Sequence, residues 1–581
     1  MVYKEFFREN IYFFVILLIG LGISVGKYDW QANYNASKAS FFLSFYLYLI
    51  FSFCLYFGVK TFFEIKTAVL TLLPFSIIFN FPIHFFNLDN FRYFKDRPLY
   101  FCDRLNRVIG CEKQRNENNL LDRQEINWFP DFNNLFPNEI IFFIILLFIG
   151  IYLINITIKK NQFKKYFIIF YLVIVAQTFL HNSLWSPITY ITYFFSSDQL
   201  IRDAHTWFGF LFPDGSGAVN ADYISVHNLQ SLFNGVSIEA SQSVRRSFII
   251  YIASQFTYFV NPKYIYLIIN IFAWFVSSCA MFYLVKKLLG KEYAILSAFL
   301  VSTGTGFIFV VGQPAPHVVG YGLYILIPFF IEKTFIEKQS ITYNEILFSV
   351  SFLTLAFLVY DVLTLLIGSI AYCYFRKGNT KIYLQTVFSS IFFFYFYQFI
   401  AFDFLKLDNY ENTANIKQAF ITLTTYFLDF NFEYFYFNLI WTFTYIFNNI
   451  SILFFIFIPT LMLFGMVMYS PKSIYDCFSI ISLGLPALLI VIFFTMGRSG
   501  LETMPRFAYG FFPFVYIFAS IAIFKFSQFF RKEKLKKIFI SIILILNLII
   551  NNFDIFGYPA MYYHFYYGSG NYINNQIMKS Q

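Results

Sequence analysis

The sequence contains many runs of about 17–25 consecutive, mostly apolar residues. Each such run is long enough to cross the hydrocarbon core of a bilayer as an α-helix, which bonds its backbone polar groups within itself. Apolar residues make up 58% and charged residues 13% of the 581 residues. A soluble protein of this composition would expose large apolar patches. The chain is therefore predicted to be an all-α polytopic membrane protein.

Fifteen transmembrane spans are predicted from these runs. Residues 344–375 are divided into two spans because Tyr360 and Asp361 interrupt the apolar run. The run Phe248–Val260 is too short to cross a bilayer and is predicted to be a helix in the outer interface. The expected spans are 11–26, 40–59, 66–86, 140–158, 166–180, 262–285, 292–311, 317–334, 344–359, 362–375, 383–402, 449–469, 477–496, 507–527 and 537–553.

Lysine and arginine side chains gather in alternate connections between these spans. With the N-terminus inside, every inner connection is basic, as the positive-inside rule expects. This distribution accounts for the net charge of +10, and no module that binds nucleic acid is visible, so that partner is excluded. The loop 87–139 counts against this orientation because it is basic and would lie outside. The expected location is the cell (inner) membrane, with the N-terminus cytoplasmic and the C-terminus and the loop 181–247 periplasmic or extracellular.

Three parts of the chain are expected. Residues 1–160 form an N-terminal block of four spans with the outer loop 87–139, and residues 161–555 form a transmembrane core. Residues 556–581 form a short outer tail. Cys102 and Cys111 share the loop 87–139, where an outer location would allow a disulfide bond.

The polar stretch from His181 to Ser247 holds more candidate catalytic groups than any other part of the chain. It contains Asp198, Asp203 and His205, and it ends with the pair Arg245 and Arg246. Its other acids, Asp214, Asp222 and Glu239, are interpreted as turn or loop residues.

From about residue 166 onwards the layout of the chain resembles the GT-C superfamily, membrane glycosyltransferases that use polyprenyl-phosphate sugars. The first span, Tyr166–Leu180, is followed by the long loop with acidic residues and then by the short run Phe248–Val260. The next span ends in a basic turn, after which the small-residue-rich run Ala294–Gly304 begins. The sequence Met504-Pro505-Arg506-Phe507-Ala508-Tyr509-Gly510 is similar to the arginine-led late span of the superfamily. The signatures of the protein O-mannosyltransferases are absent, which leaves the subfamily and the substrate open.

The resemblance implies sugar transfer from a lipid phosphate, which needs a carboxylate to accept a proton and cations to neutralise the phosphate. Asp203 is the first candidate for this base and Asp198 the second; five residues apart on a helix, they would not share a face. A solvated loop acid or a helix cap is the alternative for each. The candidates for binding the substrate are His205, Arg245, Arg246, His317, Arg498 and Arg506.

These substrate-binding candidates also have simpler explanations. The arginines could instead extend to lipid headgroups, and His205 could be an ordinary polar surface group of the loop. No Asp-x-Asp motif occurs in the loop 181–247, which favours transfer without a metal or other cofactor, although some relatives hold a divalent metal with paired acids.

The leading hypothesis is an inverting glycosyltransferase. It would transfer a sugar from a polyprenyl-phosphate donor to a lipid or glycan acceptor of the cell envelope, among membrane lipids at the outer face. A polysaccharide polymerase or ligase is the nearest alternative, since it uses similar carriers. A flippase or transporter of lipid-linked sugars is the alternative from a different class. It would place paired charges or broken helices deep within many spans.

Overall fold

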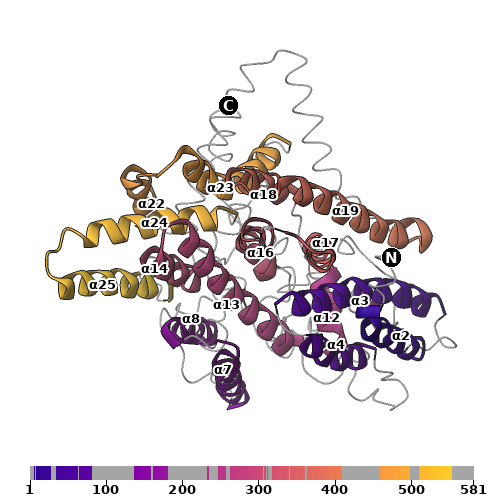
Figure 1. Cartoon of the computed structure of the whole chain (residues 1–581). Helices are drawn as coiled ribbons and strands as arrows, with labels where there is room; N and C mark the ends of the chain where they lie inside the picture. Colours follow the sequence, from indigo (N-terminus) through magenta and orange to yellow (C-terminus); the bar gives the residue numbers. More distant parts are fainter. Residues whose placement is uncertain are drawn as a thin grey trace, which may run out of the picture.

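The computed structural model describes residues 6, 8–27, 34–62, 65–80, 137–158, 161–180, 232–233, 247–256, 262–304, 307–308, 311, 317–338, 340–359, 363–407, 457–497 and 510–552. This part of the chain is helical and contains no strand (Figure 1). Its elements are α2 (Ile11–Val25), α3 (Tyr34–Phe62), α4 (Ile65–Phe79), α7 (Pro137–Thr157), α8 (Asn161–Phe179), α12 (Ser247–Phe256), α13 (Pro262–Leu288), α14 (Lys291–Ser302), α16 (His317–Ile331), the π-helical turn η6 (Glu332–Ile336), α17 (Tyr343–Phe357), α18 (Leu363–Phe375), α19 (Thr380–Phe399), the π-helical turn η7 (Ile400–Phe404), α22 (Phe457–Met468), α23 (Ile474–Gly497), α24 (Phe512–Ser527) and α25 (Glu533–Asn552).

The all-helical prediction is confirmed for the described residues, and each of the fifteen predicted spans overlaps one of these helices. The run 344–375 forms two helices, α17 and α18, as expected from its polar interruption. Within the part of the chain that the structure describes, five helical segments are long and apolar enough to cross a membrane: Ser37–Thr61, Ile140–Thr157, Ile265–Leu288, His317–Ile336 and Thr380–Phe404. They indicate a membrane protein, while fifteen crossings remain a prediction.

Helix α13 lies at the centre of the bundle and runs diagonally through Figure 1. It packs against α8, α12, α14 and α16, whereas α24 packs against α14 and α22, and α3 packs against α17. The outer helices α7 and α19 bury little of their surface. On α19, for example, Phe388 and Phe392 are about two-thirds exposed. Large exposed apolar side chains of this kind suit helices that face lipid.

The short helix predicted at 248–260 is present as α12, but its surroundings differ from the expectation. Eight of its ten residues are buried, because α3, α4 and α13 pack around it. Its first turn is bonded to the core: the hydroxyls of Ser247 and Tyr397 lie 2.8 Å apart, and the backbone N–H of Phe248 donates to the carbonyl of Leu358 at 3.1 Å. Helix α12 is thus enclosed by protein, where the sequence predicted a helix lying along the membrane interface.

Several connections predicted to be cytoplasmic lie together at one side of the bundle. Charged and cation–π contacts join the connections that follow α7, α13, α16, α18 and α22. These contacts are Lys287 Nζ–Glu337 Oε1 at 2.6 Å, Arg376 Nη2–Glu332 Oε1 at 2.8 Å, Arg376 Nη1–Asp476 Oδ1 at 3.9 Å, and Lys286 Nζ at 4.3 Å from the ring centroid of Phe163. We call this side of the bundle the basic side.

The most buried charge on the basic side is the carboxylate of Glu332, at the start of η6. It accepts hydrogen bonds from the hydroxyl of Tyr372 at 2.9 Å and from two nitrogens of Arg376, at 2.8 and 3.2 Å. Burial opposes the charge on Arg376, but its hydrogen bonds to Glu332 and its electrostatic interactions with Tyr372, Glu332 and Asp476 together outweigh burial and raise the pKa of the guanidinium. The pair therefore fastens the end of α16 to the end of α18.

Replacing Glu332 by leucine should leave the guanidinium of Arg376 partly buried without its carboxylate. Loss of one partner of a buried ion pair typically costs about 3 kcal/mol or more. The control is Lys333→Met, which breaks an exposed pair with Glu337 and should cost less than about 1 kcal/mol. Thermal unfolding in detergent measures both changes, and equal losses of stability in the two variants would contradict this role of Glu332.

Candidate functional site

Of the eight predicted site residues, His317 alone lies within the described residues. Those outside them are Asp198, Asp203, His205, Arg245, Arg246, Arg498 and Arg506. Their predicted roles therefore stay predictions. The helix ends from which their segments begin are described, and these ends show which parts of the chain meet.

The polar stretch 181–247 begins at the C-terminal end of α8. There the side-chain amide of Gln177 donates to the carbonyl of Ser302 at 2.8 Å, and both residues are buried. Ser302 is the last residue of α14, where the final carbonyls lack partners within the helix. A side-chain donor from α8 therefore completes the end of α14, and the polar stretch starts beside it.

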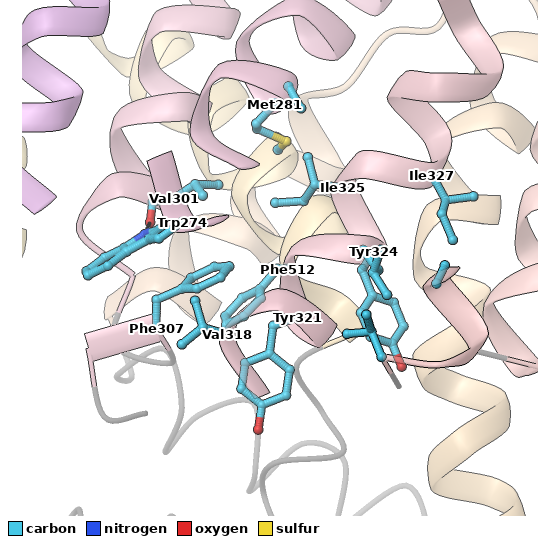
Figure 2. Packing of buried hydrophobic residues seen from close by; sticks show 14 of the residues in the cluster. Trp274, Met281, Val301, Phe307, Val318, Tyr321, Tyr324, Ile325, Ile327 and Phe512 are labelled. Carbon is cyan, nitrogen blue, oxygen red and sulfur yellow. Dashed lines mark hydrogen bonds between the residues drawn. The ribbon is translucent and has the colours of Figure 1, made fainter. Parts of the chain in front are cut away.

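A stack of aromatic rings adjoins this helix end (Figure 2). The indole N–H of Trp274 donates to the carbonyl of Val301 at 2.7 Å, and the ring of Phe307 lies parallel to the indole at a centroid distance of 5.5 Å. Phe512 stacks on Phe307 at 5.2 Å. Phe512 is the first residue of α24 and follows Arg506 by six residues. The start of α24 therefore lies next to the end of α14.

His317 belongs to the same group of rings. It is the first residue of α16, it is buried, and its imidazole stacks on the ring of Tyr321 at 6.0 Å. Tyr321 in turn meets both Phe307 and Phe512 edge-on, each at 6.4 Å. We call Trp274, Phe307, His317, Tyr321 and Phe512 the aromatic cluster. It joins the starts of α16 and α24 to α13 and to the end of α14.

Sequence reasoning missed the aromatic members of this cluster, but the small residues of 294–304 carried a signal. A Cβ atom placed on Gly304 would lie 2.7 Å from the hydroxyl of Tyr516, and the hydroxyl of Ser297 donates to that of Ser520 at 2.8 Å. Small residues allow helices to approach closely in membranes. The run that resembles a superfamily feature thus lets α24 pack directly on α14.

Within the polar stretch, Leu232 and Phe233 are described, and both contact the N-terminal helices or α12. The hydroxyl of Ser40 in α3 donates to the carbonyl of Leu232, and the ring of Phe233 meets that of Tyr251 in α12 at 5.4 Å. Leu232 and Phe233 are fully buried. Arg245 and Arg246 directly precede α12 in the sequence, so the segment that carries them ends at a helix fixed in the core.

No protein-family model matches the chain, and comparison with curated proteins and with solved structures gives no match. Among the described residues there is no group of three or more His, Cys, Asp or Glu side chains that could hold a metal ion. The function is therefore inferred from the arrangement of the helix ends and from the residues of the segments between them.

Truncation of Phe307 should disrupt the aromatic cluster. Phe307→Ala leaves a cavity between Trp274 and Phe512, and large-to-small changes of this kind cost about 3–5 kcal/mol. The control is Phe392→Ala on α19, whose side chain is 65% exposed; such surface changes typically alter stability by about 0.5 kcal/mol or less. Thermal unfolding in detergent compares the two, and a stability of Phe307→Ala equal to that of the control would show that the cluster is not tightly packed.

Proposed function

We propose that the chain is an integral membrane glycosyltransferase that moves a sugar, with inversion, from a polyprenyl-phosphate donor to a lipid or glycan acceptor at the outer face. The observation that carries this proposal is the meeting of four helix ends at and beside the aromatic cluster. The stretch with Asp198 and Asp203 begins at the end of α8, and the segment with Arg506 leads into α24. The candidate base and a candidate phosphate ligand thus lie on segments that begin or end at one place.

The position of the basic side supports the proposed orientation. Helix α14 runs from Lys291, in a basic turn, to Ser302 beside the aromatic cluster. Helix α16 runs in the opposite direction, from His317 in the cluster to Ile331, which directly precedes Glu332 in the ionic contacts. The cluster and the basic side are therefore opposite ends of the same helices. Under the positive-inside rule the basic side is cytoplasmic, and the cluster lies towards the outer face.

In the proposed reaction, a carboxylate of the polar stretch accepts the proton of an acceptor hydroxyl. Asp203 is the first candidate and Asp198 the second. The hydroxyl oxygen forms a bond to the anomeric carbon from the face opposite the phosphate, and the polyprenyl phosphate leaves with the bonding electrons. Inversion follows from this single displacement.

Cations stabilise the charge that develops on the leaving phosphate. Arg506 is the first candidate for this role, and Arg245, Arg246 and Arg498 are the further candidates. His205 and His317 are candidates for orienting the phosphate or the acceptor.

The ion pairs of the described helices favour an enzyme over a transporter. They join Lys287 and Lys333 to Glu337, Lys338 to Glu345, Arg376 to Glu332 and Asp476, and Lys536 to Glu533. Each lies in a connection or at the helix end next to it. A transporter of charged lipid-linked sugars would place such pairs near the middle of the spans.

Replacing the base should abolish most of the transfer. In membranes supplied with labelled polyprenyl-phosphate sugars, Asp203→Asn is expected to lower the rate by about a hundredfold or more, with Asp198→Asn as the second variant. Asp222→Asn, another acid of the same stretch, is the matched control and should keep the wild-type rate. Unchanged transfer in both Asp203→Asn and Asp198→Asn would refute the base assignment. A wild-type chain that transfers no sugar from any such donor would refute the proposed function.

The orientation can be tested with single cysteines in a background without the six native ones. Lys472→Cys lies on the exposed connection between α22 and α23, on the basic side, and should resist a membrane-impermeant maleimide in intact cells. Asp214→Cys, in the polar stretch, should react. Permeabilised cells give the full labelling of each variant for comparison, and the reverse pattern would overturn the orientation.

A further inference from the structure

We propose that Lys27 is a positioning residue that fixes the N-terminal helices to α12 and thereby holds the end of the polar stretch 181–247. The inference rests on the proposed function for its catalytic meaning. It assigns a role to the first spans of the chain, which precede the part that resembles glycosyltransferases.

Lys27 lies where the ends of three helices meet. It follows α2 by two residues, and its Nζ donates to the carbonyl of Phe79, the last residue of α4, at 3.0 Å. The same nitrogen donates to the side-chain oxygen of Gln255, in the last turn of α12. The C-terminal end of a helix is partially negative because its last carbonyls are unpaired. Lys27 thus places its polar head group at the negative ends of both α4 and α12.

The second acceptor is held in the orientation that Lys27 requires. The side-chain nitrogen of Gln255 donates to the carbonyl of Tyr251 at 3.0 Å and to the hydroxyl of Ser254 at 2.8 Å. These bonds turn the amide oxygen towards Lys27. Burial lowers the pKa of Lys27 to about 7, but an ammonium and a neutral amine both donate hydrogen bonds, so both contacts are possible on either side of that pKa.

Aromatic packing runs along α12 beside this contact. Phe79 meets Tyr251 at 5.9 Å and Phe256 at 5.6 Å, and Phe51 of α3 meets Phe248 at 5.1 Å. The N-terminal helices therefore touch both ends of α12. The apolar contacts are non-directional, whereas the hydrogen bonds from Lys27 to Phe79 and Gln255 limit how far α12 can slide or turn against α4.

The position of α12 matters for the proposed site because α12 directly follows Arg245 and Arg246 in the sequence. The first turn of α12 is bonded to Leu358 and Tyr397, and Lys27 fixes its last turn. A helix held at both ends gives the chain that precedes it a fixed point of attachment. Displacement of reacting groups by about 1 Å can cost about a hundredfold in rate, so loosening this helix should affect catalysis more than donor binding.

The first experiment compares Lys27→Met with Lys60→Met. Lys60 belongs to the same helices and also donates one side-chain hydrogen bond, to Asn10 at 2.8 Å, but it lies at the other end of α3. Lys27→Met should lower kcat by about tenfold or more, with the KM for the donor little changed. The thermal midpoint should also fall, because two buried acceptors lose their donor, so the rates are compared well below it. Lys60→Met should match the wild type, and Lys27→Arg should recover most of the rate. A wild-type kcat despite a lower thermal midpoint, or a loss of kcat that Lys27→Arg does not rescue, would mean that Lys27 has a purely structural role.

The second experiment needs no activity. In a cysteine-free background, Phe79→Cys and Phe256→Cys are joined by a short thiol crosslinker, and the rate of crosslinking reports the position of α12. This rate should fall in Lys27→Met and in Gln255→Met, which removes the acceptor, but not in Lys60→Met. Gln255→Met also serves as the test if Lys27→Met does not fold.

The two proposals fail in different ways. An unchanged crosslinking rate in Lys27→Met would refute the positioning role even if transfer were lost. A wild-type chain that transfers no sugar, but whose crosslinking depends on Lys27, would refute the glycosyltransferase and leave the anchoring of α12 intact.

Discussion

The fold depends on supplying partners to polar groups that lie away from water. In an apolar environment an unpaired backbone or side-chain polar group costs several kcal/mol. The structure meets this requirement with side chains that complete helix ends: Gln177 bonds Ser302, Trp274 bonds Val301, and Lys27 bonds Phe79. On the basic side the same need is met by Tyr372 and Arg376 around the buried Glu332. These bonds determine which helix ends lie together.

Much of the helical architecture could be predicted from the sequence, because the length of an apolar run limits what it can form. Each predicted span overlaps a helix, and the polar interruption at Tyr360 and Asp361 separates α17 from α18. The burial of α12 could not be predicted in this way. Its neighbours Phe51 and Phe79 are far from it in sequence, and an apolar helix has the same composition whether it faces lipid or protein.

Less of the candidate site could be predicted from the sequence, because only charged and titratable residues stand out in an apolar chain. These include Asp203 and Arg506, and of the whole predicted set only His317 lies within the described residues. The contacts that bring the segments together come from neutral side chains, among them Gln177 and Phe307. Nothing in a single sequence distinguishes these from other residues of an apolar helix, because their role depends on partners more than a hundred residues away.

The two places that hold the polar stretch are connected through α13. Helix α12 packs against α13, which supplies Trp274 to the aromatic cluster and Asn270 to the carbonyl of Val311, at 2.8 Å. A displacement of α12 would therefore press on the same helix that supports the other end of the stretch. Because packed cores deform little, the start and the end of the stretch have one common support. The N-terminal helices contact α12 through Lys27, Phe51 and Phe79, and therefore belong to that support.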